Sequence, residues 1–121
     1  MNYEEMSNDK INELVTIAVI KQTHKNIKAV ESDVNQGCVW VETVGFSSWP
    51  ILDYCNNPAD WANLISVIIS DPTKGIKIED TGVIISDYGD FNLEDVEVRD
   101  INTGRAISIC YLKMKEANNN V

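Results

Sequence analysis

The stretch DYCNNPADWANL, residues 53–64, decides much of the fold because it contains a complete helix start. Asn57 is a residue type that favours the position just before a helix, where its side chain accepts a hydrogen bond from a free backbone N–H. Pro58 then falls at the first helical position, where its missing N–H costs nothing. Asp60 falls at the third position, where we expect its carboxylate to reach back to a backbone N–H and to favour the helix dipole. The sequence therefore predicts a helix from Pro58 onward.

Apolar residues at helical spacing predict the buried face of this helix, which we expect to end at Asp71-Pro72. They are Trp61, Leu64, Ile65 and Ile68. A helix is also predicted from Met6 to about Lys21, with Ser7 as its cap. The last segment, 103–117, alternates enough to fit a strand, but its helical stripe of apolar residues fits slightly better. We therefore expect three helices.

Five segments predict β-strands, because they are rich in β-branched and aromatic residues and because 75–79 and 96–101 also alternate apolar with polar residues. They are 27–31, 38–44, 75–79, 83–87 and 96–101. The last three are expected to be antiparallel neighbours, since their connections are too short for crossover helices. Between 75–79 and 83–87 we expect a three-residue loop with Gly82 in the left-handed conformation. Residues 45–53 are predicted to be a connection, since Pro50 lacks a ladder N–H.

The length and composition favour one soluble domain. The chain has 121 residues, of which 44% are apolar, and we assign 1–121 to a single domain. No apolar run is long enough to span a membrane, and the N-terminus lacks the pattern of a signal peptide. We expect an α+β fold in which three helices pack in layers on an antiparallel sheet, similar to an αβα sandwich.

Charge, cysteines and motifs narrow the class of function. With 19 acids, 10 bases and a net charge of −9, the chain is not expected to bind nucleic acid directly. Three widely spaced cysteines, Cys38, Cys55 and Cys110, indicate reduced thiols in the cytoplasm. The sequence contains one histidine, His24, and no phosphate-binding, zinc-protease or nucleophile-elbow motif. We therefore expect no cofactor and no metal site, and favour a non-catalytic protein.

Three segments carry a family likeness: MSNDKINELV (6–15), YCNNPADWANLI (54–65) and GRAISICYLKMKE (104–116), with a β-meander before the last. The chain resembles the NinX-like family of lambdoid phages, whose small proteins have no known function. Its outline is also similar to the wider group of phage ABA-sandwich domains, in which helices and an antiparallel sheet pack in layers. The resemblance implies a phage or prophage source, the cytoplasm of a bacterial host and a C-terminal helix. It implies no reaction.

Two candidate surfaces follow from the residues. In the first, Asn56, Asn57 and Asp60 orient a ligand at the helix start, with Trp49 and Tyr54 as walls. The alternative for the same residues is a helix cap, with Asn56 bracing the preceding loop. The second is an acidic surface within 79–100, which would either face solvent or imitate the phosphate rows of DNA. Its acids are Asp87, Asp90, Glu94, Asp95 and Glu97.

These observations leave three hypotheses about function. The leading one is a phage accessory protein that binds a protein partner. Self-association as a homodimer is an open alternative within this hypothesis. Trp49, beside Pro50 in a polar segment, is a candidate aromatic anchor for such an interface. A second is an acidic inhibitor of a host defence or nucleic-acid enzyme. A third is a small nucleotide-binding or ligand-binding protein, or an enzyme, with a site near Asn56 and Asp60.

Overall fold

The computed structural model describes residues 1–87 and 95–119, with 118–119 described as backbone only. Within these ranges the chain forms three α-helices, one short 3-10 helix and six strands. In chain order they are η1 (Tyr3–Glu5), α1 (Asn8–Thr23), β1 (Ala29–Asp33), β2 (Cys38–Glu42), β3 (Phe46–Pro50), α2 (Pro58–Ile69), β4 (Lys74–Glu79), β5 (Gly82–Asp87), β6 (Val96–Arg99) and α3 (Thr103–Asn119).

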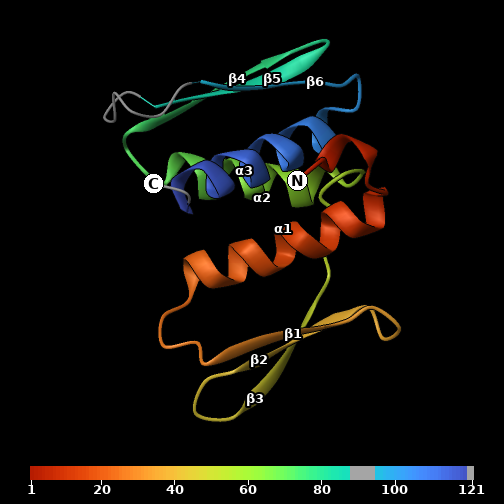
Figure 1. Cartoon of the computed structure of the whole chain (residues 1–121), viewed down its shortest axis with the longest axis vertical. Helices are drawn as coiled ribbons and strands as arrows, with labels where there is room; N and C mark the ends of the chain where they lie inside the picture. The colour runs from red at the N-terminus through yellow and green to blue at the C-terminus, as the bar shows by residue number, and fades with distance from the viewer. Residues whose placement is uncertain (88–94, 120–121) are drawn as a thin grey trace.

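The helices form a central layer between two sheets (Figure 1). Sheet A contains β1, β2 and β3 in that order, and sheet B contains β4, β5 and β6 in that order. All pairs of neighbouring strands are antiparallel. The predicted α+β class with three helices is confirmed, but the strands divide between two sheets where the sequence predicted one. The reason is that the helix layer has apolar faces on both sides, so each side needs its own sheet.

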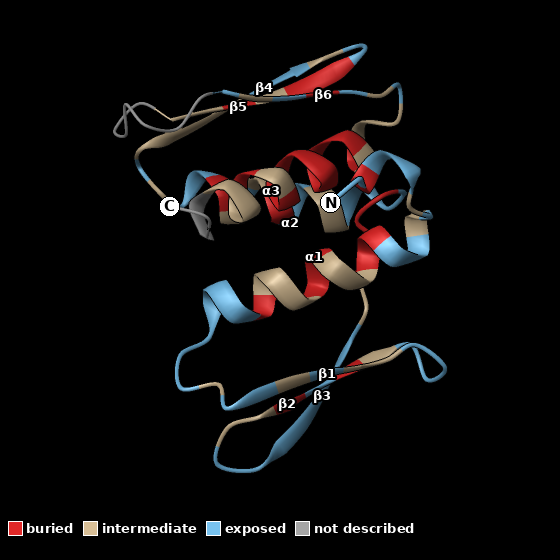
Figure 2. Cartoon of the chain, in the orientation of Figure 1, coloured by how far each residue is buried: buried red, intermediate tan, exposed pale blue. Residues whose placement is uncertain are grey.

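Helix α3 is the centre of the larger core. It contacts α1, α2, β5 and β6, and Figure 2 shows it as mostly buried. Its buried residues are Gly104, Ala106, Ile107, Ser108, Ile109, Cys110, Tyr111, Leu112 and Met114. A helix that is enclosed on nearly all sides has no clean polar stripe, which explains why 103–117 also resembled a strand. The prediction of a helix there is confirmed.

Helix α1 packs on both sides. Ile11 and Val15 belong to the larger core, whereas Ile20 packs with Val39 and Val41 of β2 in a second, smaller core. Its N-terminal cap is as predicted, since the Ser7 hydroxyl accepts a hydrogen bond from the Lys10 N–H at 3.2 Å. Because Val39 and Val41 pack against α1, sheet A is held to the helix layer only by the face that carries these two residues.

The structure corrects the prediction for 45–53. This segment was expected to be a connection, but β3 pairs with β2 from Phe46 to Pro50. Because β3 is an edge strand, Pro50 does not have to donate a ladder hydrogen bond on its outer side. The objection from Pro50 therefore applies to a central strand and not to this one.

The predicted loop at Gly82 is also wrong. Gly82 pairs directly with Glu79 as the first residue of β5, so the loop is only Asp80 and Thr81. Gly82 does not have the predicted positive φ. An added Cβ would lie 2.4 Å from the Val98 carbonyl oxygen, so glycine is required there by the close approach of β6. None of the helices in the described ranges combines the length and the apolar character needed to span a membrane.

Candidate functional site

The segment before α2 forms the predicted helix cap. The Asn57 side-chain oxygen accepts a hydrogen bond from the Ala59 N–H at 3.0 Å, and Pro58 is the first helical residue. The Asp60 carboxylate does reach back, but to the Asp53 N–H at 2.9 Å and not to the cap residue itself. It thereby fixes the chain that enters the helix.

Asn56 belongs to a network that joins α1, the segment 53–57 and the start of α3. Its amide nitrogen donates to Asp53 Oδ1 at 3.3 Å, and its oxygen accepts from Asn102 at 3.4 Å. Asn12 of α1 donates to the same Asp53 oxygen at 3.0 Å and accepts from the Cys55 N–H at 3.0 Å. These contacts favour a bracing role for Asn56. Ligand binding by Asn56, Asn57 and Asp60 stays a prediction.

Replacing Asn57 by alanine is expected to lower the free energy of unfolding by about 1 kcal/mol, because one N–H of the first turn of α2 loses its partner. Asn56→Ala is the matched control and should cost less, since its two hydrogen bonds are longer and exposed. Urea unfolding of the two variants measures both values. Equal losses, or no loss in Asn57→Ala, would contradict the capping role.

Trp49 and Tyr54 face a cavity whose lining does not include Asn56, Asn57 or Asp60. Tyr54 is only 3% exposed, and burial raises its pKa from 10.0 to about 12. Trp49 is partly exposed on β3, and its ring meets that of His24 edge to face, with centroids 4.6 Å apart. Both residues line a small cavity between α1 and β3, whereas Asn56 lines a separate, open hollow. The structure therefore divides the predicted ligand site into two places.

The predicted acidic surface is not continuous over the described residues. Asp87 is not a surface acid, because its side chain is 3% exposed and pairs with Lys74 at 2.5 Å. The cause is the register of sheet B, which places the two residues directly opposite each other. Glu97 pairs with Arg99, and Asp95 is exposed. Asp90 and Glu94 lie outside the described residues.

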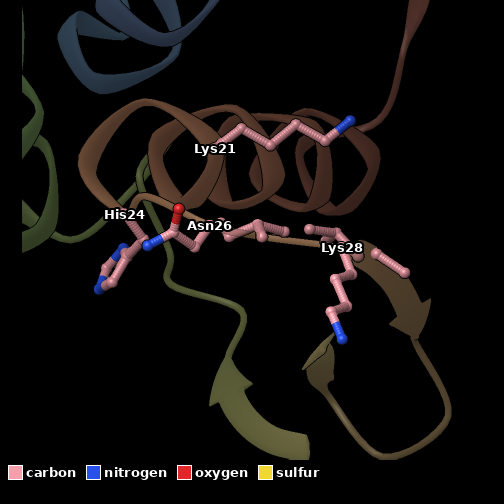
Figure 3. Close-up of a pocket in the computed structure, with 7 residues that line it drawn as sticks. Lys21, His24, Asn26 and Lys28 are labelled. Carbon is pink, nitrogen blue, oxygen red and sulfur yellow. The ribbon is translucent and has the colours of Figure 1, made fainter. Parts of the chain in front are cut away.

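A basic hollow lies at the end of α1, with a volume of about 430 Å³ (Figure 3). Lys21, His24 and Lys28 contribute to its lining. Figure 3 shows the Lys21 and Lys28 side chains pointing in different directions, so their ammonium groups do not converge on one point. This hollow therefore does not have the geometry of an anion-binding site.

Burial disfavours the thiolate form of Cys55 and Cys110. Burial raises the pKa of Cys55 from 9.0 to about 11 and that of Cys110 from 9.0 to about 12. Because the thiolate is the reactive form, both side chains behave as small apolar core residues. Among residues 1–87 and 95–119, no three His, Cys, Asp or Glu side chains are grouped so that they could hold a metal ion.

The outer face of sheet A carries two exposed aromatic side chains, Trp40 and Phe46. Val39 and Val41 of β2 point to the core, so Trp40 between them points outward. Trp40 is 40% exposed and Phe46 is 75% exposed. The strand register places nine residues on this outer face: Ala29, Glu31, Asp33, Cys38, Trp40, Glu42, Phe46, Ser48 and Pro50. Figure 1 shows no described element on that side of the sheet.

This outer face is also acidic. Glu31 lies directly across from Trp40, and Asp33 and Glu42 stand at the same face. None of the three forms an ion pair with a side chain in the described ranges, and no lysine or arginine lies among the nine residues. The acids are therefore free to meet cations of another molecule.

Sequence reasoning placed the aromatic anchor at Trp49 and missed Trp40 and Phe46. The signal for Trp40 was present, because CVWVE (38–42) puts two valines on one face of a strand and a tryptophan on the other. Phe46 had no such signal, since its strand was not predicted.

Comparisons with known proteins add no assignment to this geometry: no protein-family model matches the chain, and neither a curated protein nor a solved structure is similar to it.

Proposed function

We propose that this protein is non-catalytic and acts by binding a protein partner on the outer face of sheet A. The observation that carries the proposal is the exposure of Trp40 and Phe46 on a sheet face that the core does not use. Tryptophan side chains are enriched among the residues that dominate interface binding energy. An uncovered aromatic sheet face is also costly to leave in water, which favours a partner that covers it.

The partner that fits this face has an apolar strip edged by lysine or arginine. Glu31, Asp33 and Glu42 surround the two aromatic residues, and the whole chain has a net charge of −9. Opposite charges speed the encounter and select the partner, and this attraction weakens as salt is added. Two copies of the chain would repel each other at this face, so a different protein is favoured over a homodimer.

The proposal includes a phage or prophage accessory protein in the bacterial cytoplasm. This part rests on the resemblance of 6–15, 54–65 and 104–116 to the NinX-like family. The acidic outer face is also compatible with the hypothesis that the chain inhibits a host defence or nucleic-acid enzyme. An acidic surface attracts proteins that handle nucleic acid. If the partner is such a protein, duplex DNA should compete with the chain for it.

Affinity capture from a bacterial lysate with matched variants tests the proposal. Trp40→Ser and Phe46→Ser should each reduce recovery of the partner at least roughly tenfold, because each removes an aromatic anchor. Ile101→Ser is the control, since Ile101 is also exposed but lies outside sheet A. Thermal melting of each variant checks that the fold is kept. Equal recovery with all variants, or equal loss including the control, would contradict the proposal.

Charge reversal separates the acidic contribution. Glu31→Lys should weaken binding of the same partner most at low salt, and the difference from the unaltered chain should shrink as salt rises. Glu5→Lys, an exposed acid in η1, is the control and should change binding little. A salt-independent effect of Glu31→Lys would argue against a basic partner.

A further inference from the structure

The cavity between α1 and β3 has a volume of about 150 Å³ and is partly open to solvent. Apolar side chains form most of its wall, among them Val19, Ile20 and Leu52. Trp49 and His24, whose rings meet edge to face, close another part of it. An apolar cavity of roughly this size in another protein is known to hold a benzene molecule, so the space suits one small ring.

Two hydroxyl groups in the cavity wall have bonding capacity that the protein does not use. Tyr54 is 3% exposed, and its hydroxyl forms no hydrogen bond with any described residue. Among the described residues, only Ser32 has a side-chain oxygen that is both closed to solvent and without a hydrogen-bond partner. The Tyr54 hydroxyl has no partner but does not belong to this group, so it still reaches solvent-accessible space. Thr16, also 3% exposed, accepts a hydrogen bond from the Leu52 N–H at 3.3 Å. Its own proton has no acceptor among the described residues.

We propose that this cavity binds a small aromatic molecule that carries one oxygen acceptor, held by the Tyr54 and Thr16 hydroxyls. A ligand oxygen inside the cavity would give these two hydroxyl protons an acceptor, in place of the solvent water that reaches them. The apolar walls supply the affinity for the ring, and the two hydroxyls supply the selectivity for oxygen. The site is separate from the outer face of sheet A, because Trp49 points to the side of the sheet opposite Trp40.

Titration with phenol and toluene tests the proposal, since the two probes have almost the same size and differ in the oxygen. The Trp49 indole resonance reports binding in both cases. Tyr54→Phe should weaken phenol binding roughly tenfold and leave toluene binding unchanged, because it removes one hydrogen bond without losing volume. Tyr111→Phe is the matched control: the Tyr111 hydroxyl is paired with Gln22 at 2.6 Å and lies outside the cavity wall. It should leave both probes unchanged.

A cavity-filling variant makes the location itself testable. Val19→Phe should abolish binding of both probes while thermal melting shows a folded chain, because the larger side chain occupies the space of the ring. The proposal is overturned if neither probe binds the unaltered chain, or if Val19→Phe has no effect. It is also overturned if Tyr54→Phe changes phenol and toluene binding equally. Trp40→Ser should leave phenol binding unchanged, which keeps this test independent of the protein-binding proposal.

Discussion

Replacing Gly104 by alanine is expected to destabilise the fold by about 3 kcal/mol, even though Gly104 lies in a helix. An added Cβ would lie 2.5 Å from the Tyr54 carbonyl oxygen, 2.6 Å from that of Cys55 and 2.6 Å from Trp61 Cδ1. Two of these atoms belong to the backbone of the segment that enters α2, so the segment and α3 would have to separate. Urea unfolding of the variant measures the loss.

The sign of this effect distinguishes packing from helix propensity. Alanine is better than glycine inside a helix by about 1 kcal/mol, so propensity alone predicts a more stable variant. Gly45→Ala is the matched control, because nothing lies within 4 Å of a Cβ added there and its φ is not positive. It should be neutral or slightly stabilising. A stabilised Gly104→Ala variant would show that α3 does not pack against 54–55 as described.

Replacing Asp87 by asparagine is also expected to cost about 3 kcal/mol, because it leaves the Lys74 ammonium buried without its carboxylate. The two side chains are 3% and 7% exposed, respectively, and their charged atoms lie 2.5 Å apart. Breaking a buried ion pair is expensive, since the remaining charge keeps its desolvation cost. The change in the midpoint of chemical unfolding, at an unchanged slope, reports the loss.

Removing both charges should restore much of this stability. In Asp87→Leu with Lys74→Met, both members of this ion pair are replaced by apolar side chains, so the double variant should be more stable than Asp87→Asn. Lys10→Met is the exposed control. Its pair with Glu13 spans 3.2 Å at the surface of α1, and losing it should cost no more than about 0.5 kcal/mol. A similar loss in Lys10→Met and Asp87→Asn would mean that Asp87 is a surface acid after all.

Local signals in the sequence predicted the helices well. Ser7 and Asn57 are caps whose chemistry acts within a few residues, so both helix starts follow from neighbouring side chains. The alternation in 75–79 and 96–101 and the β-branched run in 83–87 likewise predicted the strands of sheet B, and their short connections predicted the antiparallel pairing. These features depend on residues close together in the chain.

Features that depend on distant contacts were not predictable in the same way. The division into two sheets arises because α1 packs on both of its sides, which no local pattern reports. The burial of Asp87 follows from the register that places it opposite Lys74. The candidate binding residues Trp40 and Phe46 share a face only because β3 pairs with β2. The aromatic and acidic residues of this site can be read from the sequence. Their position on one common face could be known only once the pairing of the strands in sheet A was known.

The most direct test of protein binding through sheet A is amide hydrogen exchange of the chain alone and in complex with its captured partner. We expect added protection in β2 and β3, residues 38–50, with α3 unchanged, because the partner covers the outer face while the core stays as it is. Protection confined to 53–60 or to 95–100, with none in 38–50, would contradict the proposal that Trp40 and Phe46 form the binding surface.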